Sequence, residues 1–158
     1  MFPILAFAMS AFAIEPDTAA QAPKIFHHGF RLGYTYLALA QDYGIRPDLF
    51  VFGYELNEKI VGGEWLDVIL VENVMLAGVN QGLAVPSANF LVGVELADCV
   101  QIGTGMHLSP IGAEKSPLKQ IIAVGYMPKV GRIQVPLHLS FIPDENHWRL
   151  AATTGVNW

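Results

Sequence analysis

The sequence predicts an all-β fold, a closed up-and-down antiparallel transmembrane β-barrel of about eight strands. Apolar residues alternate with polar or small residues in runs of about ten, which is the period of strands and not of helices. Charged residues make up only 15% of the chain and apolar residues 53%, whereas a soluble domain carries about 25% charged residues. The chain has 158 residues, enough for one domain. A single barrel with lipid against its outer face accounts for these observations.

The N-terminal residues have the features of a targeting segment. Residues 2–13 form an apolar run that is as long as the core of a signal peptide and too short to cross a bilayer. Ala11 and Ala13 make an A-x-A cleavage pattern, although no Lys or Arg precedes the run. We therefore expect a signal peptide over 1–13, an extension over 14–27 and the barrel domain over 28–158. The alternative is an N-terminal helix packed on the domain.

Clusters of Gly, Pro, Asn and Asp divide the rest of the chain into alternating runs. In the clearest run, Ile133, Val135 and Leu137 share one face and Arg132 and Gln134 the other. The expected strands are 28–39, 49–60, 66–80, 86–97, 99–109, 117–128, 131–141 and 147–158. In such a barrel short turns follow the even-numbered strands. The links at Asp98 and 129–132 obey this rule, and the link 60–65 is longer than it predicts.

The composition of the second face decides which side of the sheet meets lipid. A soluble lipocalin-like barrel, the alternative with an apolar ligand inside, needs a charged outer surface. Here the less apolar face is rich in Gly and Ala with scattered charges, as expected inside a narrow bore that side chains fill. The apolar face carries aromatic residues toward strand ends, where the membrane interfaces lie; they are Phe50, Tyr54, Tyr126, Phe141, Trp148 and Trp158. We expect this face to contact lipid.

Over about residues 28–158 the chain resembles the small eight-stranded bacterial outer-membrane barrels of the OmpA and OmpX kind. The last alternating strand ends on Trp158, and in those families a C-terminal aromatic residue is part of the assembly signal. The resemblance implies a Gram-negative outer-membrane location, contact with outer-membrane lipid and lipopolysaccharide, and handling by the barrel-assembly machinery. It rests on architecture, so it implies no specific family. The expected role is non-enzymatic: structural, surface-binding or in envelope assembly.

Eight charged side chains fall on the inward face by parity, and both signs are represented. They are Arg31, Glu55, Lys59, Asp67, Glu95, Lys119, Arg132 and Arg149. Buried charges must be paired or solvated. We expect a salt-bridge network that plugs the bore, and the alternative is a narrow path for ions or small solutes.

Glu72 departs from the pattern because it shares a face with Leu70 and Val74. A carboxylate in lipid at mid-depth is unfavourable by a few kcal/mol. We expect a β-bulge near Glu72-Asn73 that turns the carboxylate inward. The functional alternative is a proton-binding site.

His138-Leu139-Ser140 resembles the His-x-Ser arrangement of the outer-membrane lipid A deacylases, which are themselves small eight-stranded barrels. In that family the His and Ser lie toward the lipid, and a Glu follows further along the chain. Here parity turns both residues inward, and Glu145 comes sooner than in the family. We expect no catalytic site, and a lipid A deacylase-like esterase that uses His138, Ser140 and Glu145 is the alternative.

No cofactor or metal site is expected. The five histidines are scattered, and His27 and His28 would point to opposite faces of a strand. Cys99 is the one cysteine. The net charge of −5 argues against nucleic acid as a partner. The Gly-rich stretches lack the strand-turn-helix context of a phosphate loop.

Overall fold

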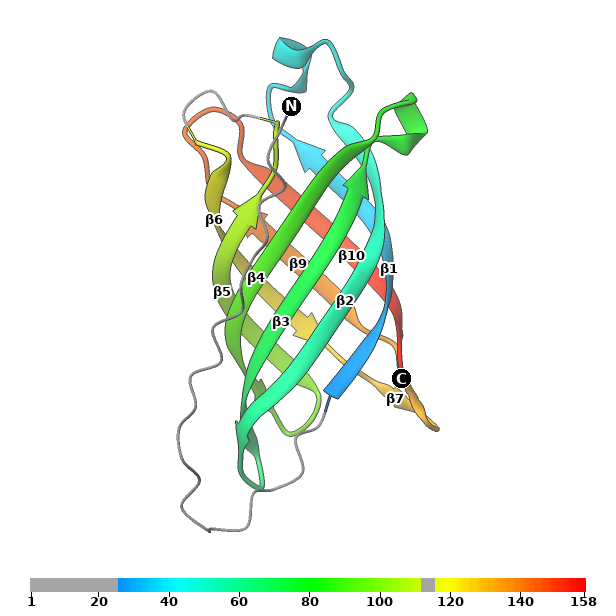
Figure 1. Ribbon diagram of the computed structural model, residues 1–158, viewed down its shortest axis with the longest axis vertical. Coiled ribbons are helices and arrows are strands. Elements are labelled where there is room, and N and C mark those ends of the chain that lie inside the picture. The colour runs from blue at the N-terminus through cyan, green and yellow to red at the C-terminus, as the bar shows by residue number, and fades with distance from the viewer. Residues whose placement is uncertain (1–25, 112–115) are drawn as a thin grey trace, which may run out of the picture.

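The computed structural model describes residues 26–111 and 116–158 (Figure 1). The strands are β1 (Phe26–Leu37), β2 (Asp48–Gly62), β3 (Leu66–Ala77), β4 (Val85–Leu96), β5 (Val100–Leu108), β6 (Leu118–Tyr126), β7 (Lys129–Val130), β8 (Ile133–Gln134), β9 (Leu137–Ile142) and β10 (Arg149–Asn157). Two short 3-10 helices, η1 (Ala40–Tyr43) and η2 (Val79–Gln81), lie in the β1–β2 and β3–β4 links. Neither is long or apolar enough to cross a membrane. The expected signal peptide and residues 14–25 of the expected extension lie outside the described residues, and β1 begins at Phe26, inside that extension.

The strands form one antiparallel sheet that closes on itself. Each barrel strand pairs with its neighbours along the chain, and β1 pairs with β10 from Gly29↔Asn157 to Leu37↔Arg149. Closure leaves no sheet edge with unpaired backbone groups, which is what a sheet needs in hydrocarbon. The predicted closed antiparallel barrel is confirmed.

Two prolines divide what are geometrically two long strands into four short ones. β6 pairs with β9, and β7 pairs with β8 in the same register. Between these two pairings, the Val135 backbone N donates to the Pro128 carbonyl O at 3.0 Å. Pro128 and Pro136 interrupt the ladder because proline has no N–H to donate. The barrel wall therefore has eight strands, as predicted. The expected strand 131–141 begins later, after a turn at Gly131, whose φ is +67°.

The two ends of the barrel differ in their connections. The β1–β2, β3–β4, β5–β6 and β9–β10 links lie at one end, called the loop end, and the β2–β3, β4–β5 and β7–β8 links lie at the opposite turn end (Figure 1). β2 continues past a bulge between Lys59 and Val61 as far as Gly62. The β2–β3 turn is therefore short, and the expectation of a long link over 60–65 was wrong. The predicted tight turn at Asp98 is present, with left-handed Ala97 and Asp98.

Glu72 faces outward. β3 pairs with β4 without a register shift along its whole length, and the bulge lies in β2, away from Glu72. The carboxylate stands between Leu56 and Phe90 on the outer wall. The prediction of a bulge at Glu72-Asn73 was wrong, because the period-two pattern identifies the face of a residue and not the position of an irregularity.

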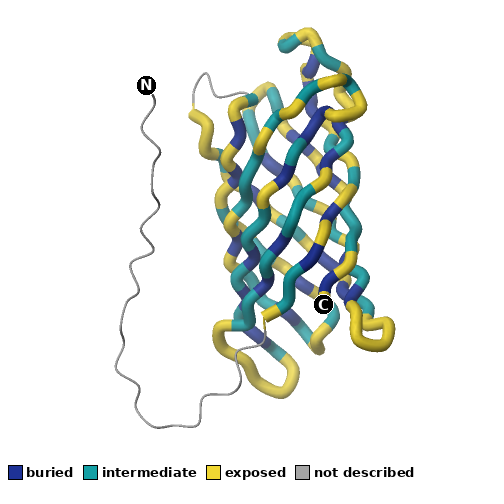
Figure 2. Tube along the Cα trace, turned by 45° about the vertical axis from the view of Figure 1, so that its right-hand side comes forward, coloured by how far each residue is buried: buried dark blue, intermediate teal, exposed yellow. Residues whose placement is uncertain are grey.

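The barrel is apolar outside and polar in much of its interior. Along most of the strands more exposed residues alternate with more buried ones (Figure 2), and large hydrophobic side chains such as Phe30, Ile102 and Leu137 are exposed on the wall. Arg31 and Glu95 are buried at 2% exposure. This is the distribution of a transmembrane barrel and the reverse of a soluble cup with an apolar ligand.

Two apolar clusters also lie inside. One fills the loop end of the lumen and comprises Leu37, Ala40, Leu49, Val51, Met75 and Ala77. The other comprises Ile69, Val71, Leu91, Ile121 and Ile142. These apolar clusters separate the polar side chains of the interior into several sets.

Candidate functional site

A buried ion pair between neighbouring strands lies near the middle of the lumen. Arg31 of β1 is ion-paired with Glu55 of β2, and its Nε donates to Glu55 Oε2 at 3.1 Å. Arg31 Nη1 also donates to Asn157 Oδ1 of β10 at 2.8 Å. Arg31 thus links β1 to both of its neighbours, β2 and β10, where the β1–β10 pairing closes the barrel. A buried pair of this kind keeps its charges only because hydrogen bonds satisfy them.

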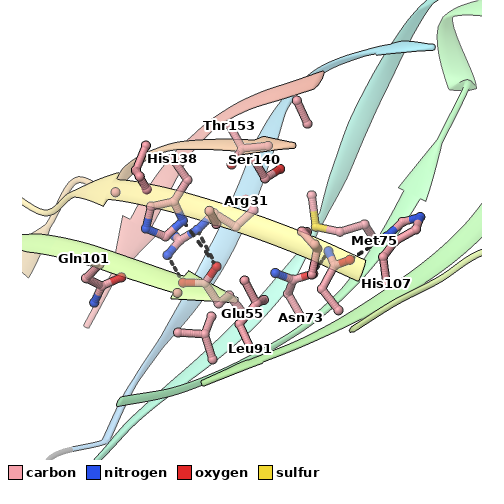
Figure 3. A pocket seen from close by; sticks show the side chains of 18 of the residues that line it. Arg31, Glu55, Asn73, Met75, Leu91, Gln101, His107, His138, Ser140 and Thr153 are labelled. Atoms are coloured by element: carbon pink, nitrogen blue, oxygen red, sulfur yellow. Dashed lines mark hydrogen bonds and ion pairs between the residues drawn. The ribbon is translucent and has the colours of Figure 1, made fainter. Parts of the chain in front are cut away.

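His138 lies beside this pair and not beside a nucleophile. Its Nδ1 is 3.7 Å from Glu55 Oε2, and Figure 3 shows the ring directed toward Arg31 and Glu55. The ring covers Gly125, where a Cβ would collide with it. No hydrogen bond in the described chain joins His138 to Ser140, and Glu145 is exposed in the β9–β10 link. The structure therefore does not bring together the three residues that the sequence offered for an esterase.

The space left in the lumen is small. A cavity of about 90 Å³ is lined by Arg31, Glu55, His138, Asn89 and Leu91 among others (Figure 3). Since a liquid water molecule occupies about 30 Å³, this volume suits a few water molecules. His138 Nε2 is buried without a hydrogen-bond partner in the described chain, and water in the cavity would satisfy it.

At the turn end, lysine ammonium groups form ion pairs with carboxylates. Lys59 Nζ lies 2.6 Å from Asp67 Oδ2, 2.7 Å from Glu95 Oε1 and 2.6 Å from Asp98 Oδ1. The contact with Glu95 is an ion pair. Lys129 Nζ is 3.1 Å from Asp98 Oδ2. These five residues are called the turn-end ion cluster.

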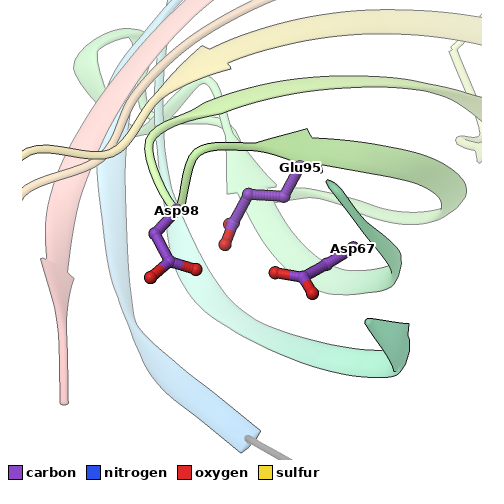
Figure 4. A group of neighbouring side chains, drawn as sticks. All are labelled: Asp67, Glu95 and Asp98. Atoms are coloured by element: carbon purple, nitrogen blue, oxygen red, sulfur yellow. The ribbon is translucent and has the colours of Figure 1, made fainter. Parts of the chain in front are cut away.

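The three carboxylates of the turn-end ion cluster converge on one point (Figure 4). Asp67, Glu95 and Asp98 offer oxygen atoms within 4.8 Å of one another, a spacing that suits a cation. The Lys59 ammonium already occupies the point between them. Hydrogen bonds from Lys59 and Lys129 lower the pKa of the Asp98 carboxyl to about 2.

At the loop end, Arg149 bonds to neutral groups. Arg149 is 5% exposed, and its Nη1 lies 2.9 Å from His107 Nε2. Since a guanidinium only donates, His107 Nε2 accepts and its Nδ1 donates to Asn89 Oδ1 at 2.6 Å. Asn89 Nδ2 then donates to Asn73 Oδ1 at 2.6 Å. Arg149, His107, Asn89 and Asn73 are called the loop-end polar chain.

Arg149 has no carboxylate partner within 26–111 and 116–158. Its Nη2 donates to the Ile111 carbonyl O at 2.5 Å, and its Nε has no hydrogen-bond partner in these residues. Lys119 nearby is ion-paired with Asp144 and lowers the pKa of that carboxyl. Among the described residues, the hydrogen-bond partners of Arg149 are therefore neutral.

At the loop end, the side chains of η2 form hydrogen bonds with the backbone of the β1–β2 link and of β2. The Gln81 amide donates to the carbonyl O of Arg46 at 3.1 Å and of Asp48 at 2.8 Å, and its Oε1 accepts from the Arg46 backbone N at 2.8 Å. Asn80 Oδ1 accepts from the Phe50 backbone N at 3.0 Å. These bonds tie the β3–β4 link to the β1–β2 link.

The β9–β10 link joins the same assembly. His147 Nε2 lies 3.2 Å from Asp42 Oδ2 of η1, and the Ala38 backbone N donates to the Trp148 carbonyl O at 3.0 Å. The links 38–47, 78–84 and 143–148 are together called the rim. Cross-bonding of this kind gives a surface loop a defined shape.

Of the eight charged residues expected in the lumen, seven point inward. Arg132 does not: it is exposed in the β7–β8 turn, because strand parity ends where the turn begins. The polar residues that sequence reasoning missed are Asn73, Asn89, His107, Asp98, Lys129, Asp144 and Asn157. Inward parity of an uncharged polar residue would have identified Asn73, Asn89, His107 and Asn157.

Comparison with known proteins gives little beyond the fold. No protein-family model matches the chain, and no curated protein matches it. Among solved structures, the chain is similar to Ail, the attachment invasion locus protein of Yersinia pestis, in complex with the heparin analogue sucrose octasulfate. The identity is 11%, the TM-score is 0.41, and the match covers 84% of this chain and 99% of that chain. A likeness at this level concerns the arrangement of strands alone.

Proposed function

We propose that this chain is a non-enzymatic barrel of the bacterial outer membrane whose rim binds a ligand at the cell surface. The observation that carries the proposal is the contrast between a filled lumen and a cross-bonded rim. The wall contacts outer-membrane lipid and lipopolysaccharide, because its outward side chains are apolar along the strands. The barrel-assembly machinery is the partner that inserts it, with Trp158 as the recognition signal.

The filled lumen argues against transport. The Arg31–Glu55 pair occupies space in the middle of the bore, and the turn-end ion cluster lies at one end. An apolar cluster that includes Leu37 and Leu49 fills the other end. Solute passage would require these groups to separate, so the narrow path is the weaker hypothesis.

The rim supports recognition because it presents apolar groups on a fixed backbone. Leu39 is 44% exposed and has a left-handed φ of +52°, a conformation that costs a non-glycine residue about 1 kcal/mol. Val79 on the neighbouring link is 49% exposed. A strained, exposed leucine held by its surroundings is a feature of ligand contacts.

The esterase is less well supported, because His138 and Ser140 face the lumen and not the acyl chains of lipid. We propose that Ser140→Ala leaves lipid A acylation unchanged. Loss of a 3-hydroxyacyl release activity in a folded Ser140→Ala protein would favour the enzyme.

Surface labelling tests the location and orientation. In a Cys99→Ser background, Gln41→Cys places a thiol on η1 of the rim and Glu64→Cys places one in the β2–β3 turn. A membrane-impermeant maleimide added to intact cells should label Gln41→Cys and not Glu64→Cys. The protein should fractionate with outer membranes and migrate differently on gels before and after boiling. Recovery in the soluble periplasm without detergent would contradict the proposal.

Complementation tests the role of the rim. A Leu39→Gly, Val79→Ser double variant should assemble with normal heat-modifiable migration and fail to restore the phenotype of a deletion strain. Phe52→Leu on the outer wall is the matched control and should restore it. Full complementation by the rim variant would place the function elsewhere.

A further inference from the structure

The outer wall of the barrel has two unlike halves. On β1, β2, β9 and β10 outward aromatic rings pack on one another, as in the pairs Tyr34–Phe50, Tyr36–Trp148 and Phe30–Tyr54. On β3, β4, β5 and β6 the outward aromatic residues in the described chain are Phe90 and Tyr126. The first is called the aromatic half and the second the aliphatic half. Aromatic side chains anchor a barrel at the membrane interfaces, so the two halves are suited to different surroundings.

Glu72 lies in the centre of the aliphatic half. It occupies the middle of the twelve-residue strand β3 and pairs with Phe90 of β4. Its carboxyl makes no hydrogen bond or ion pair with any residue of 26–111 and 116–158. A carboxyl at this depth is unfavourable against hydrocarbon unless a polar group meets it. That group must come from outside the described chain.

Thr104 provides a complementary group at the same depth. It faces outward in the middle of β5 and pairs with Val92 of β4. Its Oγ donates to the Ile121 carbonyl O at 3.0 Å and keeps its lone pairs for another donor. Glu72 and Thr104 therefore stand on the two sides of β4, each at mid-strand.

We propose that the aliphatic half is the interface between two copies of this chain, with β4 at the two-fold axis. A two-fold axis along the membrane normal keeps every residue at its depth and brings β3 of one copy opposite β5 of the other. The Glu72 carboxyl forms a hydrogen bond with Thr104 Oγ of the partner subunit, and symmetry repeats the bond. Phe90 and Val92 pack about the axis, and both aromatic halves remain in lipid.

The self-complementary placement is the reason to choose a second copy as the occupant. Each copy contributes one donor and one acceptor on opposite sides of the same strand, so two copies satisfy both without any other molecule. Hydrogen bonds between polar side chains stabilise contacts between proteins within membranes. The inference does not depend on ligand binding at the rim, because a monomeric barrel could still bind there.

Disulfide cross-linking in membranes tests the position of the interface. In the Cys99→Ser background, Phe90→Cys on β4 should form a homodimer under mild oxidation. Phe52→Cys on β2 is the matched control, since Phe90 is 46% and Phe52 41% exposed on the wall, and it should remain monomeric. Equal cross-linking of the two variants, or a Phe90→Cys adduct with the mass of a different protein, would overturn the proposal.

The role of the carboxyl is tested by mass measurement in lipid nanodiscs and detergent over a range of protein concentrations. Glu72→Leu should raise the dimer dissociation constant about tenfold or more, because two hydrogen bonds are lost. Glu72→Gln retains a donor and should dimerise nearly as well as the natural protein. Heat-modifiable migration checks that each variant is folded. A natural protein that stays monomeric at every concentration, or a Glu72→Leu protein that dimerises as tightly, would refute the interface.

Discussion

The turn end and the loop end of the lumen treat buried charge in different ways. At the turn end Lys59 meets three carboxylates, and further into the lumen Arg31 meets Glu55. At the loop end Arg149 bonds to a neutral imidazole and a carbonyl oxygen. Both arrangements supply hydrogen bonds to the cation, but among the described residues only the first places an opposite charge beside it. The difference is that ion pairs neutralise the buried cations of the turn end and the middle, whereas the described partners of Arg149 carry no charge.

The largest effect is expected from breaking the central pair. Glu55→Gln leaves the Arg31 guanidinium buried without a negative partner and should destabilise the barrel by about 3 to 5 kcal/mol. Urea unfolding in detergent or lipid measures the change. The double variant Arg31→Met, Glu55→Leu removes both charges and should recover most of the loss. A loss in the double variant as large as in Glu55→Gln would show that packing, and not charge, is responsible.

Lys59→Met should have the next largest effect. The change leaves Asp67, Glu95 and Asp98 close together without a cation and should destabilise by about 2 to 3 kcal/mol. Calcium added to the variant should restore part of the stability, since the vacated point is surrounded by carboxylate oxygens. Unfolding with calcium and with a chelator measures this. The natural protein is the control, and a calcium effect of equal size there would contradict occupation of the point by Lys59.

Arg149→Met should change stability much less than Glu55→Gln. Two hydrogen bonds are lost, but a buried cation with no carboxylate partner among the described residues is removed as well, so the two effects should offset each other to within about 1 kcal/mol. The same unfolding assay applies. A loss as large as in Glu55→Gln would mean that a carboxylate neutralises Arg149 in solution and that the two ends are alike.

Asp98→Asn should have the smallest effect, with a defined pH dependence. The pKa of Asp98 is lowered to about 2 in the folded protein, so its contribution is complete above the unfolded value near 4 and is lost as pH falls through about 2. Because the side chain is half exposed, solvent screening limits the contribution to less than about 1 kcal/mol. Stability measured between pH 5 and pH 2 should show the two proteins converging at the acid end.

Alternation along the chain was sufficient to predict the eight strands, since a one-residue shift would turn every apolar side chain inward. It also placed Arg31, Glu55 and Lys59 in the lumen. It failed for Arg132, where parity no longer applies, and for Glu72, where an unfavourable carboxylate was assumed to be avoided by a bulge.

The turn-end ion cluster could not be predicted as a unit. Lys59 lies in β2, Asp98 in the β4–β5 turn and Lys129 in β7, and only the curvature of the closed sheet brings them together. The rim was equally hidden, because Asn80 and Gln81 act through backbone partners that sequence patterns do not reveal.

The hydrogen-bond partners of Arg31 also imply an order of events during folding. Glu55 reaches Arg31 within the local β1–β2 hairpin, whereas Asn157 lies 126 residues away along the chain. The ion pair can therefore form early and remain wet until β10 arrives. Arrival of β10 joins segments that are far apart in the chain, which is the slow step in folds of this topology. Closing the ring is thus also the moment at which the centre of the lumen is separated from bulk water.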